Sequence, residues 1–249
     1  MQNNKTHKIE IVTSVNSEGP WQPLVPYQIP HAPYNPQQEI DERRVDYLVQ
    51  VNSNFYFKVR VLCLAESECY CQVKMSVDGE PVQLSAFEYS TLHICDEIME
   101  LQPENGDKKV HYKFTPLQIA EQDEEKEEAN SLLERGVGTI KLSFRRITHL
   151  FEVRPNTDSW EKAIPNIDEK TIKIDEKATK RCGLHATKET FGPLNANREF
   201  YSTKFEEKPF EVFFFHYRDQ IGFLHEKKYR FQKCFIIAPN STRRISTPG

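Results

Sequence analysis

The sequence predicts a mainly β fold, an antiparallel β-sandwich of jelly-roll-like form with a few short helices. Three observations predict it. Short runs of alternating apolar and polar residues recur along the chain, turn-forming residues separate these runs, and the 249 residues include 16 Phe and 10 Tyr. Broad rings pack well on a pleated surface. Regularly spaced short strands with turns between them are typical of a sandwich.

The first half of the chain contains the clearest strand patterns. The strongest is 55–64, where every second residue from Phe55 onward falls on one apolar face. The same alternation predicts three further strands, at 9–15, 45–51 and 71–77. The tight-turn pair Asp78-Gly79 then leads into a short strand at 82–84.

Six prolines in residues 20–36 predict a stiff connector. Two of its segments, Pro23-Leu-Val-Pro26 and Pro33-Tyr-Asn-Pro36, also fit a polyproline ligand that recruits a partner. The favoured interpretation is a connector whose aromatic residues hold it across the sandwich.

Residues 115–135 are predicted to form an acidic helical insertion. Thr115 can cap a helix that starts at Pro116, where a missing N–H costs nothing. The residues that follow are good helix formers, although their low apolar content leaves a disordered loop as the alternative. Residues 121–135 hold seven acids and two bases, a local charge of −5 against −4 for the whole chain. The rest of the chain is therefore almost neutral.

The second half of the chain adds further strands at 91–95, 110–114 and 139–147, and a short helix at 175–183. Residues 210–217 are apolar on both faces, which predicts a central strand or a covered edge. We expect one domain over 1–249 with a flexible tail at 240–249.

The strongest metal-like pattern is Cys69-x-Cys71 followed by His93-x-Cys95. Two ligands at i and i+2 on a strand point to the same side, so two strands could offer four groups to zinc. The parity argues against it, because Cys71 shares its side with the predicted core residues Val73 and Met75, whereas His93 and Cys95 lie opposite Leu92 and Ile94. Buried thiols are the favoured interpretation, and no metal is expected.

No motif for nucleophilic catalysis or phosphate binding is present. The sequence has no G-x-S-x-G elbow and no Walker loop, and Gly136-x-Gly138 precedes a strand instead of opening a helix. We therefore expect no catalytic residues and no cofactor. A zinc- or thiol-dependent enzyme stays as the weakest alternative.

Two segments are candidates for contact with a partner. Acidic side chains of the insertion could contact a basic partner, and the basic and aromatic residues near the C-terminus could follow phosphates and stack bases. Anchoring of those aromatic residues in the core is the alternative for the second segment. The candidates are Glu124, Glu125, Glu127, Glu128, Lys227, Lys228, Tyr229 and Arg230.

The order of several short segments resembles a known family. Val77-Asp-Gly79 closes a strand, Gly138-Thr-Ile140 begins one after the acidic segment, and Glu176 to Gly183 precedes a strand that ends in Tyr217-Arg218; Phe235-Ile-Ile-Ala-Pro239 follows. This succession resembles DUF7918, an uncharacterised eukaryotic family of β-rich domains. The resemblance would cover residues 9–239. It implies a fold and a eukaryotic origin, and it implies no activity.

The sequence thus favours a non-enzymatic protein–protein interaction or scaffold domain, with a nucleic-acid or chromatin-associated protein as the alternative. The first residues lack the apolar stretch of a secretory signal, and no run approaches the ~18 apolar residues of a membrane span. We therefore expect an intracellular protein, cytoplasmic or nuclear, that has a protein partner and no membrane contact.

Overall fold

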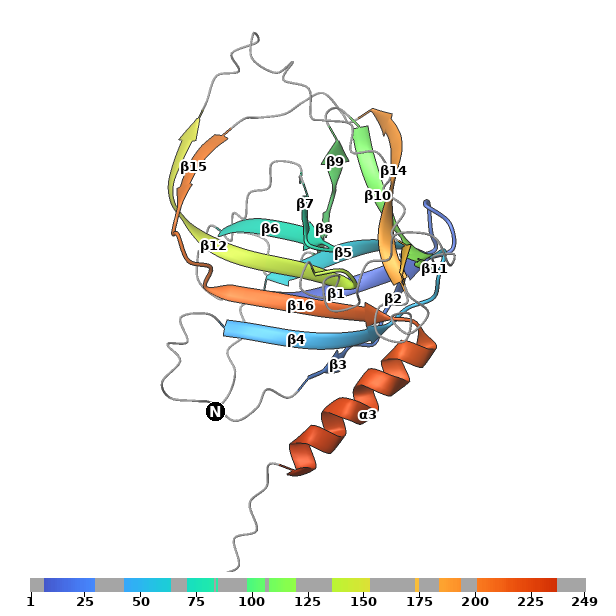
Figure 1. Ribbon diagram of the computed structural model, residues 1–249. Coiled ribbons are helices and arrows are strands. Elements are labelled where there is room, and N and C mark those ends of the chain that lie inside the picture. The colour runs from blue at the N-terminus through green and yellow to red at the C-terminus, as the bar shows by residue number, and fades with distance from the viewer. Residues whose placement is uncertain are drawn as a thin grey trace, which may run out of the picture.

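In the computed structural model, strands dominate the residues that are described, and these strands form two seven-stranded sheets and one two-stranded sheet (Figure 1). The mainly β sandwich predicted from the sequence is confirmed. The structure describes residues 7–29, 43–63, 71–82, 84, 98–105, 108–119, 136–152, 173–174, 184–193 and 201–236.

The first sheet is antiparallel throughout. Its order is β14 (Leu184–Pro193), β10 (Lys108–Pro116), β5 (Tyr56–Cys63), β1 (His7–Ser14) and β2 (Gln22–Pro23). Two short strands extend it, β8 (Ile98–Leu101) beside β5 and β9 (Glu104–Asn105) beside β10.

The second sheet has the order β3 (Tyr27–Gln28), β4 (Arg43–Gln50), β16 (Glu211–Arg218), β12 (Thr139–Glu152), β6 (Cys71–Val77) and β7 (Glu80–Val82). β15 (Tyr201–Phe205) pairs with the distal part of the long strand β12. As the two-sided apolar pattern predicts, β16 is central, between β4 and β12. Its pairing with β4 is parallel, which departs from an all-antiparallel jelly roll.

The predicted start of the acidic helix is wrong. Thr115 and Pro116 continue strand β10, where they pair with His185 and Leu184. The next residues form β11 (Gln118–Ile119), which pairs in parallel with β13 (Lys173–Ile174). The sheet hydrogen bonds of β10 extend through Thr115, so local capping preference is overridden by pairing. Residues 120–135, and the helix expected at 175–183, lie outside the described residues.

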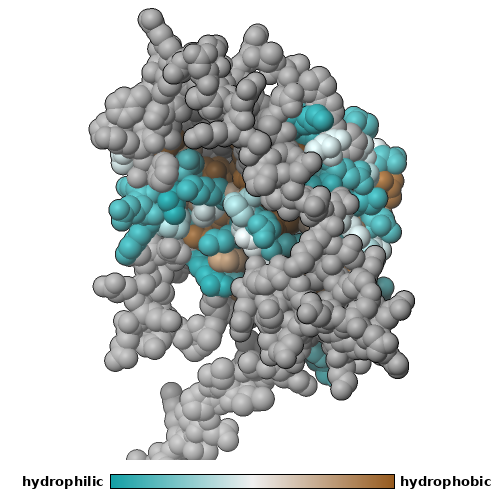
Figure 2. Space-filling view, turned by 45° about the horizontal axis from the view of Figure 1, so that its top comes forward, coloured by the Kyte–Doolittle hydropathy of each residue, from teal (hydrophilic) through white to brown (hydrophobic). Residues whose placement is uncertain are grey.

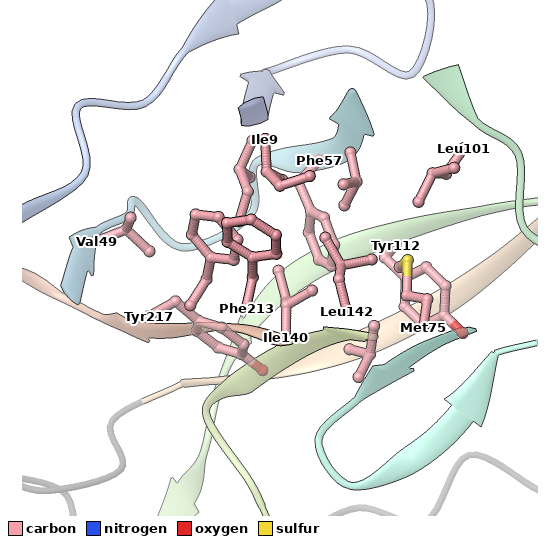
Figure 3. Packing of buried hydrophobic residues seen from close by; sticks show 14 of the residues in the cluster. Ile9, Val49, Phe57, Met75, Leu101, Tyr112, Ile140, Leu142, Phe213 and Tyr217 are labelled. Atoms are coloured by element: carbon pink, nitrogen blue, oxygen red, sulfur yellow. The ribbon is translucent and has the colours of Figure 1, made fainter. Parts of the chain in front are cut away.

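The core lies between the facing sides of the two sheets (Figure 3). Each side follows the period of two read from the sequence. The first sheet contributes Ile9, Ile11, Phe57, Val59 and Val61, and the second contributes Met75, Ile140, Leu142, Phe213 and Phe215, all buried. Burial of one such side chain stabilises the fold by about 1.5–3 kcal/mol. In the view of Figure 2, hydrophilic residues cover most of the described surface, with smaller hydrophobic areas between them.

The described part of the proline-rich connector joins the sheets. Its β2 pairs with β1 in the first sheet, and its β3 pairs with β4 in the second. The Lys58 ammonium nitrogen lies 4.5 Å from the ring centroid of Trp21. The Lys227 ammonium nitrogen lies 5.0 Å from the ring centroid of Tyr27. These contacts hold two aromatic residues of the described part of the segment against lysines of β5 and α3.

The one helix described in detail, α3 (Gln220–Ile236), follows β16 directly and lies beside β4 (Figure 1). Asp219 caps it, because its Oδ1 accepts a hydrogen bond from the Gly222 N–H at 2.7 Å. Arg218 Nε lies 2.9 Å from Glu226 Oε2 and ties the second turn of the helix to the end of β16. No helix among the described residues is long and apolar enough to cross a membrane.

Candidate functional site

Asp78 lies at the turn between β6 and β7, with a φ of 53°. Its Oδ1 accepts hydrogen bonds from the Gly138 N–H at 2.7 Å and from the Tyr217 hydroxyl. Its Oδ2 accepts one from the Ala186 N–H of β14, at 2.6 Å. Tyr217 belongs to the second sheet and Gly138 directly precedes strand β12 of that sheet, whereas Ala186 belongs to the first sheet. The carboxylate therefore ties the two sheets together at one end of the core.

The carboxylate of Asp78 is enclosed, although part of the residue is exposed. This burial is the largest influence on Asp78 and raises its pKa, while the hydrogen bonds from Tyr217, Ala186 and Gly138 act in the opposite direction. Tyr112 lies near it in the core, and burial together with the Asp78 charge raises the pKa of its hydroxyl. Because groups from both sheets donate hydrogen bonds to both oxygens of this carboxylate, we assign the cluster a structural role.

Three of the segments that carry the family resemblance meet at this carboxylate. They are the turn at Asp78-Gly79, the strand start at Gly138 and the strand end at Tyr217-Arg218. Arg218 Nη1 donates to the Gly138 and Tyr217 carbonyl oxygens at 2.8 and 2.7 Å. Gly138 has a φ of 77°, and a Cβ there would lie 2.5 Å from Arg218 Nη1, so the close approach requires glycine.

A second buried cluster lies at the opposite end of the same strands. Glu211 Oε2 of β16 lies 2.8 Å from His7 Nδ1 of β1, and Cys71 Sγ of β6 lies 3.8 Å from His7 Nε2. The imidazole also stacks on Phe144, with 4.1 Å between ring centroids. His7 comes from the first sheet and its partners from the second, so this cluster too joins the sheets.

The thiol, imidazole and carboxylate have the order found in cysteine hydrolases, but they are closed off from solvent. The exposed fractions of Cys71, His7 and Glu211 are 1%, 2% and 1%. A structural cysteine that is buried in this way is inert, because a substrate cannot reach its sulfur atom. We therefore assign the cluster a structural role.

The cluster is also unsuited to a metal ion. The thiol and the carboxylate engage opposite nitrogens of His7, so one ion could not contact all three groups. Within the described part of the chain, no group of three or more His, Cys, Asp or Glu side chains could hold a metal. Of the four metal candidates, Cys71 is described and has His7 as its neighbour; Cys69, His93 and Cys95 lie outside the described residues.

His7 and Glu211 were not among the residues singled out from the sequence. A signal was present for both, because His7 continues the inward parity of Ile9 and Ile11, and Glu211 that of Phe213 and Phe215. A polar residue on the inward side of a strand needs a buried partner. The sequence does not say which one.

The C-terminal candidates lie on α3. Lys227 is half-buried and packs against the rings of Tyr27 and Phe223, 5.0 and 5.7 Å from their centroids, while Lys228 is exposed. Tyr229 and Arg230 belong to the same helix. The acidic candidates Glu124, Glu125, Glu127 and Glu128 lie outside the described residues.

The side of α3 that faces away from the sheets is partly apolar. Ile221 and Leu224 are 70% and 58% exposed, and His225 and Lys228 are exposed beside them. Residues three or four positions apart share one side of a helix. Gly222 and Phe223, on the other side, are covered more fully.

The outer side of the second sheet carries a polar cluster around Asp46. Arg44 donates to both carboxylate oxygens at 2.7 and 3.0 Å, and His216 Nε2 lies 2.9 Å from Oδ1. Burial is the largest influence and by itself raises the pKa of Asp46. The hydrogen bonds and positive charges of His216 and Arg44 together hold that pKa well below its ordinary value of 3.8.

Comparison with known proteins gives a family. A family model described as "Domain of unknown function (DUF7918)" matches residues 11–222. Neither the curated proteins nor the solved structures contain a match to the chain.

Proposed function

The chain belongs to the DUF7918 family, and on that premise we propose that it is a non-enzymatic protein-interaction module whose partner binds the outer side of α3. The sandwich serves as the scaffold that presents this helix.

The exposed apolar pair on α3 carries the proposal. Ile221 and Leu224 lie one turn apart on the side of the helix that is turned away from the sheets, where they are 70% and 58% exposed. Apolar side chains that share an exposed side of a helix and have polar neighbours are typical of a protein interface. The partner would anchor an apolar segment on this pair.

The charged residues of α3 indicate which groups on a partner would surround the apolar contact. The helix contains four basic residues and one acid, Glu226, and that acid is paired with Arg218. Exposed Lys228 lies beside the apolar pair. An apolar anchor flanked by acidic residues therefore fits this side of the helix best.

The buried ionisable groups support a scaffold role. Asp78 and Glu211 are each held by partners from across the core, so they stabilise the contact between the sheets and are not presented to a substrate. A rigid support lowers the entropic cost of binding, because the binding helix is held in one position.

Affinity capture with variant proteins tests the proposal. The double substitution Ile221→Asp and Leu224→Asp should abolish capture of a partner that the wild-type protein retains, because it places charge in the apolar contact. The double substitution Val15→Asp and Ile98→Asp is the matched control, since these two apolar residues are 57% and 53% exposed and lie outside α3. Equal partner recovery by both variants, with unchanged thermal unfolding midpoints, would reject α3 as the interface.

Nucleic-acid association through α3 is the alternative function. Lys227 is packed between two rings, which leaves Lys228 as the exposed lysine of the described part of the helix. Backbone recognition gives an affinity that falls steeply with salt. Binding to a single-stranded oligonucleotide that is strong at low salt and lost in Lys228→Gln would favour this alternative over a protein partner.

A further inference from the structure

The start of α3 lies close to both flanks of residues 120–135, which are outside the described residues. After this segment, the Gly138 carbonyl oxygen accepts a hydrogen bond from Arg218 Nη1 at 2.8 Å, and α3 starts two residues after Arg218. Before it, the Phe114 ring of β10 packs against the ring of Tyr217, with 4.8 Å between the two centroids. Both flanks of the segment therefore contact the end of β16, from which α3 extends.

The segment is long enough to reach the exposed apolar pair of α3. Gly138 lies five positions after Leu133, and an extended chain covers about 17 Å over that interval. Leu224 lies four residues beyond the first residue of α3, about 6 Å along the helix axis, and a helix with its side chains is about 10–12 Å wide. A leucine at position 132 or 133 can therefore reach the outer side of α3 while Gly138 keeps its place.

The composition of the segment is the one that the proposed interface requires of a partner. An apolar anchor flanked by acidic residues fits the outer side of α3, and Leu132-Leu133 is such an anchor, with Glu128 before it and Glu134 after it. Residues 121–135, which we call the acidic segment, hold seven acids and two bases, a charge of −5. Helix α3 holds four bases and one acid, a charge of +3. Opposite charges of this size favour the encounter of the two parts.

The charged groups of α3 already have contacts inside the fold, and the match with the acidic segment does not depend on their being free. The charge of Glu226 is offset by Arg218, 2.9 Å away, and Lys227 packs against two aromatic rings. These contacts leave the helix with a positive net charge. The exposed side chains of Ile221 and Leu224 provide the contact itself, and the charge selects an acidic segment to fill it.

We infer that Leu132 and Leu133 of the acidic segment dock on Ile221 and Leu224 of the same chain. The inference rests on the proposed function, because it takes the same side of α3 as the binding surface, and it names what occupies that side before a partner arrives. A tether this short gives the segment an effective concentration of about 1 mM. A contact with a dissociation constant of about 0.1 mM is then formed in most molecules, and a partner binds by displacing the segment.

The first test is photo-crosslinking of the purified full-length protein without any partner. A photoreactive phenylalanine analogue at Leu224 should form an adduct with residues 121–135 of the same chain, located by peptide mass spectrometry in the band of monomer size. The same analogue at Ile98, 53% exposed on the first sheet, should not form this adduct. An adduct that joins two chains would assign the segment of a second copy to α3, and no adduct with the segment would reject its docking. Either result overturns the inference.

The second test is fluorescence anisotropy with a labelled peptide of residues 121–135, which competes with the tethered segment for α3. Leu132→Asp with Leu133→Asp in the full-length protein should remove the competitor and tighten peptide binding about tenfold. Gln122→Asp with Asn130→Asp adds the same charge and keeps both leucines, so it should change peptide binding less than about twofold. Equal peptide affinities of the wild-type protein and the leucine variant would contradict docking.

Substitutions on the helix then show where the peptide binds. Adding Ile221→Asp and Leu224→Asp to the leucine variant should abolish peptide binding, whereas adding Val15→Asp and Ile98→Asp should preserve it. Peptide binding that survives the changes on α3 would overturn the inference, provided that the thermal unfolding midpoints are unchanged. Partner capture that depends on α3, without docking of the acidic segment in the purified protein, would support the proposed function and overturn this inference alone.

Discussion

Single residues decide how the two sheets are joined, and Asp78 is the clearest case. Its carboxylate accepts from two backbone amides and one hydroxyl. Asp78→Asn keeps the shape of the side chain, but it replaces one accepting oxygen with an amide NH2 group that faces a hydrogen-bond donor. We expect a loss of about 2–4 kcal/mol in the free energy of unfolding, measured with urea. Glu80→Gln, at an exposed neighbouring residue, is the control. If Asp78→Asn lowers the free energy of unfolding no more than this control does, the structural role of the cluster is contradicted.

The lowered pKa of Asp46 predicts how the free energy of unfolding changes at acidic pH. Because its pKa is lowered in the folded state, it contributes stability above the ordinary value of 3.8 that is lost as the pH falls below that value. The free energy of unfolding should decrease as the pH falls from about 5 to about 2. Asp46→Asn should be less stable at neutral pH and show a shallower decrease. Parallel profiles for the two proteins would contradict the assignment.

The cluster of Cys71, His7 and Glu211 predicts unequal costs. Glu211→Ala leaves a buried imidazole without its carboxylate and should cost about 3–5 kcal/mol. Cys71→Ala removes only a small group and should cost about 1–2 kcal/mol. Urea unfolding measures both, and equal costs would contradict the interpretation.

The same cluster makes a prediction about reactivity. Alkylation of the native protein, read by peptide mass spectrometry, should leave Cys71 unmodified until the protein unfolds, because the thiol is 1% exposed. Rapid native alkylation at Cys71 would instead favour the thiol-dependent enzyme.

At the scale of elements, α3 depends on its cap. The Asp219 carboxylate accepts from the Gly222 N–H, and loss of such a cap costs about 1 kcal/mol. Asp219→Ala should therefore speed amide hydrogen exchange in the first turns of α3, while β12 and β16 stay protected. Asp219→Ser, which keeps a capping oxygen, should restore slow exchange. Equal exchange in all three proteins would show that packing alone holds the helix.

The strand elements were predictable to the extent that one side of each is buried. The period of two located β5 and β6, and the two-sided apolar run indicated that β16 is buried on both sides, as a central strand or a covered edge. The helix start at Thr115 was wrong because capping and propensity are local, whereas the pairing of β10 with β14 depends on residues about 70 positions away. The parallel pairing of β4 with β16 likewise has no local signal.

At the scale of the whole molecule, the two buried clusters lie at opposite ends of one core. Asp78 and Cys71 are at the two ends of β6, and Tyr217 and Glu211 are at the two ends of β16. Their hydrogen bonds join residues 108 and 204 positions apart in sequence. Sequence patterns could place each polar residue on an inward or outward side, but they could not pair it. The buried clusters and the exposed apolar pair Ile221 and Leu224 therefore came from the structure, whereas the fold class and the basic and aromatic candidates on α3 came from the sequence.

The central claim, that a partner binds the outer side of α3, is tested most directly by site-specific photo-crosslinking. A photoreactive phenylalanine analogue at Leu224 should form a covalent adduct with a protein partner in the source cell. The same analogue at Ile98, which is 53% exposed on the first sheet, should not form that adduct. No adduct from position 224, or the same adduct from both positions, would contradict the claim.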